Sequence, residues 1–252
     1  MAVLQPAVLF KYHADNEYLE TMLANSELFY SPASIFNDPA EFKFTYLEGI
    51  SLDEFEKSPN KPIGQTLRRN FDPQTFFEVM KEKTLDAFSQ MGVCCFAHSP
   101  YNYLMWSHYA KSHTGVCLIF DAPKDREIFM RINPVVYADT IPYLDFRKPF
   151  LEEFVRAVTT KAACWAYEEE WRGVKGASGI HKFNKQALIG VVFGQRMQEE
   201  RKDVIKEICA KHGLQSSFFD CVFEKNSYNI ELRHHPAGEV FNLVVPPYKG
   251  AT

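Results

Sequence analysis

The sequence predicts an α+β fold, with helices flanking a mixed and largely antiparallel sheet around a cleft. Short apolar runs bounded by turn residues, typical of strands, are spread along the whole chain. Stretches with helical spacing lie between them, but strand and helix do not alternate strictly enough for a parallel βαβ fold. Hydrophobic residues make up 46% and aromatic residues 15% of the 252 residues, which is typical of a globular chain with a large core.

The elements of the first half follow from apolar spacing and from residues that end an element. Leu19, Met22 and Leu23 recur at helical spacing, and Pro32 ends the strand that comes next. A long charged stretch with spaced aromatics indicates a helical insertion. In order, we expect a strand at 8–12, a helix at 16–25, a strand at 27–31, a turn at 36–39, the insertion at 51–91, a strand at 93–96, a helix at 102–111 and a strand at 115–121.

The second half continues in the same mixed order. Gly194 ends one apolar run, and Gly213 ends an amphipathic helix. We expect a strand at 135–137, a helix at 149–164, a strand at 188–193, a helix at 198–212, and strands at 217–223 and 227–233. The whole chain, 1–252, is predicted to be a single domain with an extended C-terminal segment at 234–252.

Charge and cysteine usage narrow the class of protein. A net charge of −4, with no long basic run, argues against a broad surface for nucleic acid. The six cysteines form no Cys-x-x-Cys pair and lie mostly in apolar runs, which predicts buried thiols in a reducing, cytoplasmic setting. There is neither a secretion signal nor an 18-residue apolar stretch, so we expect no contact with a membrane. The oligomeric state stays open.

The segment from Trp165 to Arg172 carries the strongest functional pattern. If it is extended, Glu168, Glu170 and Arg172 share one face, with the two carboxylates roughly 6–7 Å apart along the strand. Such a polar face between aromatic residues belongs in a cleft. The alternative is a helix, in which Glu168 and Arg172 form an ordinary surface pair four residues apart.

The central run at 102–113 is dense in aromatic and hydrogen-bonding side chains. It is either a helix that packs its apolar residues inward, or a surface on which Trp106 and Tyr109 stack a ligand ring. Ser107 and His108 are adjacent, which does not place the imidazole as a base for that hydroxyl. The spacing of His98, His108 and nearby residues matches no known ligand pattern, so we expect no metal. The chain also lacks a P-loop.

Several motifs, taken in order along the chain, resemble the bacterial family known as domain of unknown function 2971. They are Lys11-Tyr12-His13, the run from Leu28 to Pro32, Phe36-Asn37-Asp38-Pro39-Ala40-Glu41, Cys95-Phe96-Ala97, Leu104-Met105-Trp106-Ser107-His108-Tyr109-Ala110, His113 to Cys117, and Lys161 with Trp165 and Tyr167 to Arg172. Ala40 and Ala97 depart from the residues expected at those positions. The resemblance spans residues 9 to about 233 and implies a fold more than an activity.

The order of a second set of residues resembles that of ADP-ribosyltransferases. His13 on the first strand, Ser107 or Tyr109 in the middle, and Glu168 or Glu170 late in the chain follow the order of that superfamily's site. The resemblance implies NAD as a substrate. Glu170 would stabilise the oxocarbenium-like state formed when nicotinamide leaves, and Glu168 would orient or deprotonate an acceptor.

The same resemblance implies binding roles for residues around the carboxylates. His13 would hold the adenosine-side ribose, and Tyr109 would stack on nicotinamide. The other residues expected to contact the nucleotide are Tyr12, Ser31, Asn37, Trp106, Ser107, His108 and Arg172.

The leading hypothesis is therefore an intracellular, NAD-using ADP-ribosyltransferase-like enzyme, such as a toxin or defence effector. Its partners would be a small-molecule nucleotide and a protein or nucleic-acid acceptor. Two alternatives remain open: a non-catalytic nucleotide- or ligand-binding module with the same cleft, and a protein–protein interaction domain whose aromatic residues belong to the core.

Overall fold

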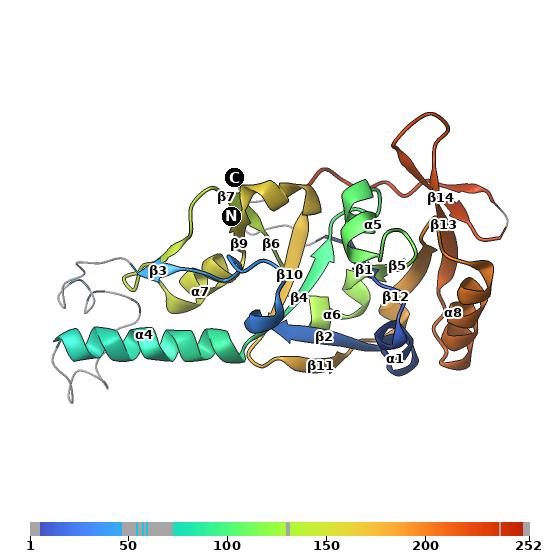
Figure 1. The fold of residues 1–252 in the computed structure, drawn as a ribbon. Coiled ribbons are helices and arrows are strands. Elements are labelled where there is room, and N and C mark those ends of the chain that lie inside the picture. Colours follow the sequence, from blue (N-terminus) through green and yellow to red (C-terminus); the bar gives the residue numbers. More distant parts are fainter. Residues whose placement is uncertain are drawn as a thin grey trace.

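The fold is α+β, with a large and mostly antiparallel sheet, as predicted (Figure 1). The computed structural model describes residues 6–46, 73–129, 132–236 and 238–248, together with residues 54, 57 and 59. Within the described chain, no helix has the length and apolar character needed to cross a membrane.

Eleven strands of the described chain form the main sheet. Nine of them follow the order β11-β2-β4-β1-β5-β12-β13-β14-β15. The other two form a branch, in which β10 pairs with β4 and β6 pairs with β10. Neighbouring strands are antiparallel except for β12 and β13. The strands are β1 (Val8–His13), β2 (Glu27–Pro32), β4 (Gly92–Ala97), β5 (Val116–Asp121), β6 (Ile132–Pro134), β10 (Glu170–Lys175), β11 (Gly179–Lys182), β12 (Leu188–Phe193), β13 (Ser217–Phe223), β14 (Ile230–His234) and β15 (Val240–Phe241).

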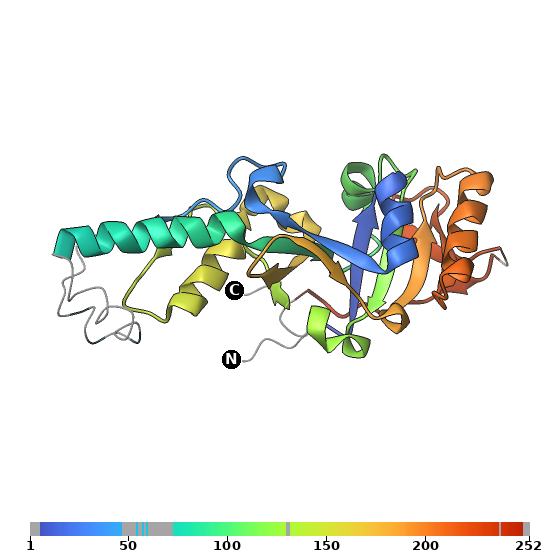
Figure 2. The same ribbon diagram turned by 90° about the horizontal axis from the view of Figure 1, so that it is seen from below.

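Both faces of the central strands are buried. Along β5, Leu118 and Phe120 pack into one core cluster, while Cys117 and Ile119 pack into the other, as strand alternation requires. The first cluster includes side chains of α1 (Glu17–Asn25), α6 (Arg126–Phe129) and α8 (Glu199–Lys211); the second includes side chains of α5 (Tyr103–Tyr109). Figure 2 shows α1 and α8 side by side at one end of the molecule.

At the other end of the molecule, α4 (Pro73–Gln90) runs outward from the sheet beside α7 (Phe150–Val158) (Figures 1 and 2). Phe88 of α4, Phe154 of α7 and Leu144 of β8 (Tyr143–Leu144) meet in a third core cluster. The helix α4 covers the second half of the predicted insertion at 51–91. Apart from residues 54, 57 and 59, positions 51–72 lie outside the described residues.

The sheet opens between β1 and β2. Both strands pair with the same edge of β4, but β2 does so only through Ser31 and Pro32, and β1 only through Phe10. The helix α1, capped by Asn16, links the two strands where they diverge. The carbonyl of Cys95 in the exposed middle of β4 accepts a hydrogen bond from the Lys11 ammonium group at 3.1 Å instead of a strand partner. This divergence creates the cleft that the sequence predicted only in general terms.

Two predicted elements around residue 160 need correction. The helix expected at 149–164 ends at Val158, because Thr159 and Thr160 turn their hydroxyls back to carbonyls of the last turn. The chain then forms β9 (Thr160–Ala162), which pairs with β7 (Val136–Ala138). A short 3-10 helix, η3, follows at Ala163–Glu168.

The Glu-rich segment is therefore neither fully extended nor an α-helix. Glu169 has left-handed backbone geometry, with φ of 44°, and the strand β10 begins at Glu170. Glu170 and Arg172 share one face of β10, as strand alternation predicts, whereas Glu168 reaches the same place from η3. The 3-10 turn was not visible in the apolar pattern, because a segment this short has no periodicity.

The C-terminal segment predicted at 234–252 contains β15 and is otherwise irregular as far as residue 248. Its Tyr248 hydroxyl donates to the carbonyls of Val135 and Glu170 at 2.9 and 3.0 Å, which fixes the segment against β10. Residues 249–252 lie outside the described residues. The arrangement of residues 1–252 as a single domain stays a prediction.

Gly115, at the start of β5, is expected to tolerate no side chain. An added Cβ would lie 2.2 Å from the carbonyl oxygen of His13. Both atoms are attached to the backbone, so the clash cannot be relieved by turning a side chain. We expect Gly115→Ala to lower the free energy of unfolding by about 1–3 kcal/mol, measured by urea denaturation. Gly176→Ala, where a Cβ meets nothing within 4 Å, is the matched control and should stay within about 0.5 kcal/mol of the unsubstituted chain. Equal effects of the two substitutions would contradict this packing.

Candidate functional site

A large pocket lies where β1 and β2 diverge, with α1 along one side. We call it the outer pocket; its volume is about 670 Å³, within the range of small-molecule sites. Tyr12, His13 and Ser31, three residues predicted to bind nucleotide, all line it. Burial lowers the pKa of His13, and its Nδ1 lies 2.7 Å from the Ala14 carbonyl oxygen. Exposed aromatic side chains, Tyr18 and Phe29, also line this pocket.

A smaller pocket of about 120 Å³ adjoins the outer one and shares Lys11 and Tyr12 with it. We call it the inner pocket. It lies over the middle of β4, at the stretch of its edge where neither β1 nor β2 pairs with it. Its lining includes Glu168, Glu170 and Tyr109. The structure thus brings the predicted catalytic residues together. Four further aromatic and amide side chains complete much of the lining, namely Phe10, Phe36, Asn37 and Phe96.

Five buried ionic side chains form one network, which we call the ion cluster, at one end of the inner pocket. Its members are Glu41, Lys161, Glu168, Glu170 and Arg172. Lys161 contacts all three carboxylates, at 3.1 Å for Glu41 and for Glu170, and it also donates to Glu168. Burial disfavours charge on Lys161, but the three carboxylates outweigh it and raise the pKa of the ammonium group. Lys161 therefore stays charged.

Glu170 is the more tightly held of the two predicted catalytic carboxylates. Arg172 donates to both of its oxygens, at 2.8 and 3.1 Å, and Lys161 donates to one of them. The thiol of Cys95 donates to it as well. Burial alone raises the pKa of Glu170, but the two cations outweigh it and hold that pKa below its ordinary value. Glu170 is therefore charged at neutral pH, and both of its oxygens already accept hydrogen bonds.

Glu168 has different partners and a different electrostatic state. The Tyr109 hydroxyl donates to its Oε1 at 2.5 Å, and Lys161 donates to its Oε2. Burial, opposed by Lys161 and reinforced by the charge of Glu170, raises the pKa of Glu168. Burial and Glu168 in turn raise the pKa of Tyr109, so this phenol stays protonated. The pKa values of Glu168 and Glu170, which are two residues apart, are therefore shifted in opposite directions.

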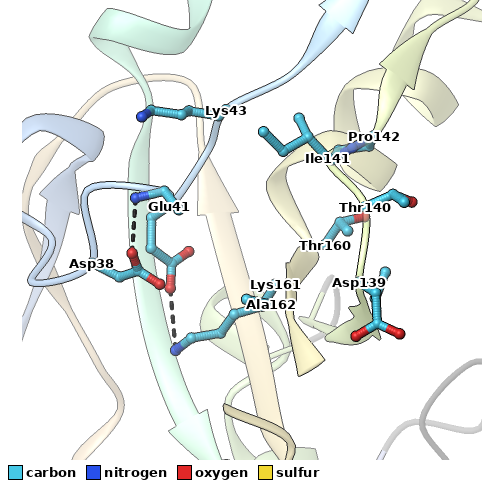
Figure 3. Close-up of a pocket in the computed structure, with 12 residues that line it drawn as sticks. Asp38, Glu41, Lys43, Asp139, Thr140, Ile141, Pro142, Thr160, Lys161 and Ala162 are labelled. Carbon is cyan, nitrogen blue, oxygen red and sulfur yellow. Dashed lines mark hydrogen bonds and ion pairs between the residues drawn. The ribbon is translucent and has the colours of Figure 1, made fainter. Parts of the chain in front are cut away.

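The loop from Phe36 to Phe42 covers the ion cluster. Asn37 hydrogen-bonds the Tyr109 hydroxyl, and Asp38 accepts from the Trp165 indole at 2.8 Å. Figure 3 shows the Glu41 carboxylate pointing toward the Lys161 ammonium group at the wall of a third pocket, of about 80 Å³, which both residues line. The predicted turn at 36–39 is thus a structural part of the site.

Some predicted binding residues do not line either pocket. Trp106 is fully buried, and its Nε1 donates to the Pro100 carbonyl at 2.8 Å, so it packs in the core beneath α5. Ser107 hydrogen-bonds Tyr103 and His113. His108 is exposed. Arg172 is fully buried, pairs with Glu170 and does not line the inner pocket.

Three charged residues of the site, Lys11, Glu41 and Lys161, belong to the motifs of the sequence but were not predicted to have a functional role. Lys161 had a detectable signal, since it is a lone charge in the run Ala157–Ala163, where a buried segment must pair any cation. Glu41 carried none, because 131 residues separate it from Arg172. In the described part of the chain, no group of three or more His, Cys, Asp or Glu side chains is arranged to hold a metal ion.

Residues 105–173 match the model of the family DUF2971, described as a protein of unknown function. The matched segment contains Tyr109 and every member of the ion cluster except Glu41. No curated protein and no solved structure matches the chain.

Proposed function

We propose that this chain is an ADP-ribosyltransferase-like enzyme that cleaves the bond between nicotinamide and ribose in NAD, with Glu168 as the carboxylate at the reacting carbon. The observation that carries the proposal is a buried carboxylate of raised pKa at the end of a ring-sized pocket, next to a pocket large enough for the rest of a nucleotide.

The two pockets suit the two ends of such a substrate. A cavity of about 150 Å³ holds a benzene ring, so the inner pocket, at about 120 Å³, is close to the size of one ring, whose substituents would extend toward the outer pocket. The remainder of the dinucleotide would occupy the outer pocket. Lys11 lines both pockets, and among the described residues it forms no ion pair with a carboxylate. Its ammonium group would therefore meet a phosphate between the two ends.

Glu168 would act on the transition state rather than on bound substrate. Loss of nicotinamide leaves positive charge on the ribose, and a carboxylate fixed nearby stabilises that charge most when solvent is excluded. Tyr109 and Lys161 hold the Glu168 carboxylate in place, which limits its reorganisation. Glu170 would keep Lys161 and Arg172 charged and oriented rather than touch the ribose.

The direct test is to incubate the purified chain with NAD and measure free nicotinamide by chromatography, first alone and then with cell lysate. Release in buffer alone indicates transfer to water, and release only with lysate indicates a protein or nucleic-acid acceptor. No release from a folded chain under either condition would remove the proposal.

One observation favours a second candidate, a non-catalytic nucleotide-binding module. Both oxygens of Glu168 already have hydrogen-bond partners, as they do in a purely structural network. Titration calorimetry with NAD and ADP-ribose separates the two functions. Micromolar binding without any nicotinamide release would favour the module.

We expect the pH profile of nicotinamide release to follow Glu168. The ionised carboxylate is the active form, so protonation abolishes activity. Because burial raises the pKa of Glu168, kcat/KM should fall at a pH above the ordinary glutamate value of about 4.3. The measurement is kcat/KM against pH at constant ionic strength, with circular dichroism at each pH. An acidic limb at or below that ordinary value would assign catalysis to another group.

A further inference from the structure

A separate pocket lies between α6 and β10, on the opposite face of β2 from the outer pocket. We call it the α6 pocket; its volume is about 370 Å³, within the range of small-molecule sites. Side chains alternate along a strand, so Phe29 and Ser31 line the outer pocket whereas Tyr30, between them, lines the α6 pocket. The α6 pocket shares no lining residue with the outer or the inner pocket. The proposed cleavage of NAD therefore gives it no role.

Tyr30 brings an unsatisfied hydroxyl group to this pocket. The side chain is fully buried, and among the described residues its hydroxyl has no hydrogen-bond partner. A Cβ placed on Gly173 would lie 3.0 Å from that hydroxyl, so the group lies against β10 beside Val174 and Lys175, which also line the pocket. Burial raises the pKa of Tyr30, so the phenol stays protonated and can donate. A buried hydroxyl without a partner is destabilising, and an acceptor oxygen would relieve this.

Two cations line the α6 pocket from different elements. Arg126 comes from α6 and Lys175 from β10. The Lys175 ammonium group donates to the Glu127 carbonyl at 3.1 Å and lies 5.9 Å from the centre of the Tyr30 ring. Within the described part of the chain, Glu127 carries the single carboxylate of the lining. The lining therefore has more positive than negative charge.

A further carboxylate lies near Tyr30, since the charge of Asp125 contributes to the raised pKa of that phenol. Asp125 accepts hydrogen bonds from the backbone amides of Ile128 and Asn184, at 3.1 and 2.7 Å. These two bonds compensate much of its charge, so Asp125 opposes an anion in the α6 pocket only weakly.

The size and the apolar part of the lining indicate more than a site for a bare ion. Ile128 and Val174 supply apolar walls, and small-molecule sites combine such walls with a few polar groups that fix orientation. A cavity of about 150 Å³ holds a benzene ring, so about 370 Å³ leaves room for a ring together with a charged head.

We propose that the α6 pocket is a second ligand site, which binds a small organic anion with a phosphate or carboxylate head on a ring-sized apolar body. Arg126 and Lys175 hold the anionic head, and Ile128 and Val174 contact the body. The Lys175 side chain turns from the Glu127 carbonyl to the ligand, which uncovers the Tyr30 hydroxyl for a hydrogen bond to the head. This site is independent of the proposed function, because no residue of the α6 pocket takes part in it.

Calorimetry of the full chain with three small molecules tests the inference. Phenyl phosphate and phenylacetate carry the two kinds of anionic head, and benzyl alcohol is a neutral molecule with the same ring. We expect at least one anion to bind about tenfold more tightly than the alcohol, the effect of one charge-assisted hydrogen bond. The tighter of the two anions identifies the head. No binding of either anion, or equal binding of all three molecules, would overturn the inference.

Substitutions place the bound anion, each after circular dichroism has shown a folded chain. Lys175→Met and Arg126→Met should each weaken anion binding by about tenfold. Lys124→Met is the matched control, because Lys124 is an exposed cation near α6 that does not line the pocket, and it should leave the affinity unchanged. Anion binding that survives Lys175→Met but is lost in Lys11→Met would place the anion in the outer or inner pocket and overturn the inference.

Tyr30→Phe gives a readout that a merely structural tyrosine would not produce. The substitution keeps the ring and removes the unpaired hydroxyl, so the melting temperature of the free chain should stay the same or rise. The affinity for the anion should nevertheless fall by about fivefold or more. An unchanged affinity in this variant would remove Tyr30 from the site and contradict the proposed hydrogen bond.

Discussion

Glu168→Gln is expected to lower the rate of nicotinamide release by about 100- to 1,000-fold, the usual effect of removing one fixed group that stabilises transition-state charge. The fold should survive this change. The substitution leaves two carboxylates facing two cations in the cluster, and Lys161 keeps its contacts with Glu41 and Glu170. Because a raised pKa means that the native state disfavours the charged form of Glu168, the melting temperature at neutral pH should stay the same or rise.

The neighbouring glutamates supply the contrast. Glu170→Gln removes a carboxylate whose depressed pKa stabilises the native state at neutral pH, a contribution that is lost only as pH falls through that depressed value. Removing one partner of a buried ion pair costs about 3–5 kcal/mol, so this variant should melt earlier. Glu169→Gln lies outside the ion cluster and the inner pocket and should change neither property.

Nicotinamide release and thermal melting, measured on the same preparations, check these three variants. The expected pattern is loss of activity alone for Glu168, loss of stability for Glu170, and no change for Glu169. If Glu168→Gln keeps full activity while Glu170→Gln, still folded, loses it, the two glutamates have the opposite roles from those proposed here.

Arg172→Met is expected to lower the free energy of unfolding by about 3–5 kcal/mol. The guanidinium group is fully buried; it donates to Glu41, to Glu170 and to the Val158 carbonyl, which joins the loop at 36–42, β10 and the end of α7. Methionine fills much of the space but leaves three buried carboxylates, those of Glu41, Glu168 and Glu170, sharing Lys161. For a chain of this length the loss corresponds to a decrease in melting temperature of roughly 6–20 °C.

Thermal and urea denaturation measure this effect, with Arg201→Met as the matched control. Arg201 also contacts two carboxylates, Asp15 and Glu20, but its side chain is 32% exposed, and such pairs contribute about 0–1 kcal/mol. Adding Glu170→Gln to Arg172→Met should restore part of the lost stability, since one of the uncompensated carboxylates is then neutral. A loss no greater than that of Arg201→Met would contradict the structural role of the cluster.

The sequence predicted the elements with strong patterns and missed those set by distant contacts. The helix at 102–111 is α5, because Asn102 caps it and accepts from Leu104 and Met105. The two-residue strand β8 and the strand β9 depend on partners elsewhere in the chain, and apolar spacing over so few residues carries no signal. The divergence of β1 and β2 also depends on pairing, so only the existence of a cleft could be predicted.

The candidate site was predicted in part for a similar reason. Glu168, Glu170 and Arg172 are close in the sequence, so their proximity in space followed from local geometry. Their different pKa shifts did not, because these depend on burial and on contacts with Lys161 and Tyr109. The prediction that Trp106 contacts the nucleotide was wrong, because its ring is packed inside the core.

The pairing of Glu41 with Arg172 also bears on how the site could be inherited. The segment at 105–173 that matches a known family contains most of the ion cluster but neither Lys11 nor Glu41, which come from the first 41 residues. A relative could therefore retain this segment and still lack a counter-ion for Arg172 or one end of the inner pocket. Relatives with an intact site should be recognised by two features. One is an acidic residue in the loop after the second strand, and the other is a basic residue near the end of the first strand.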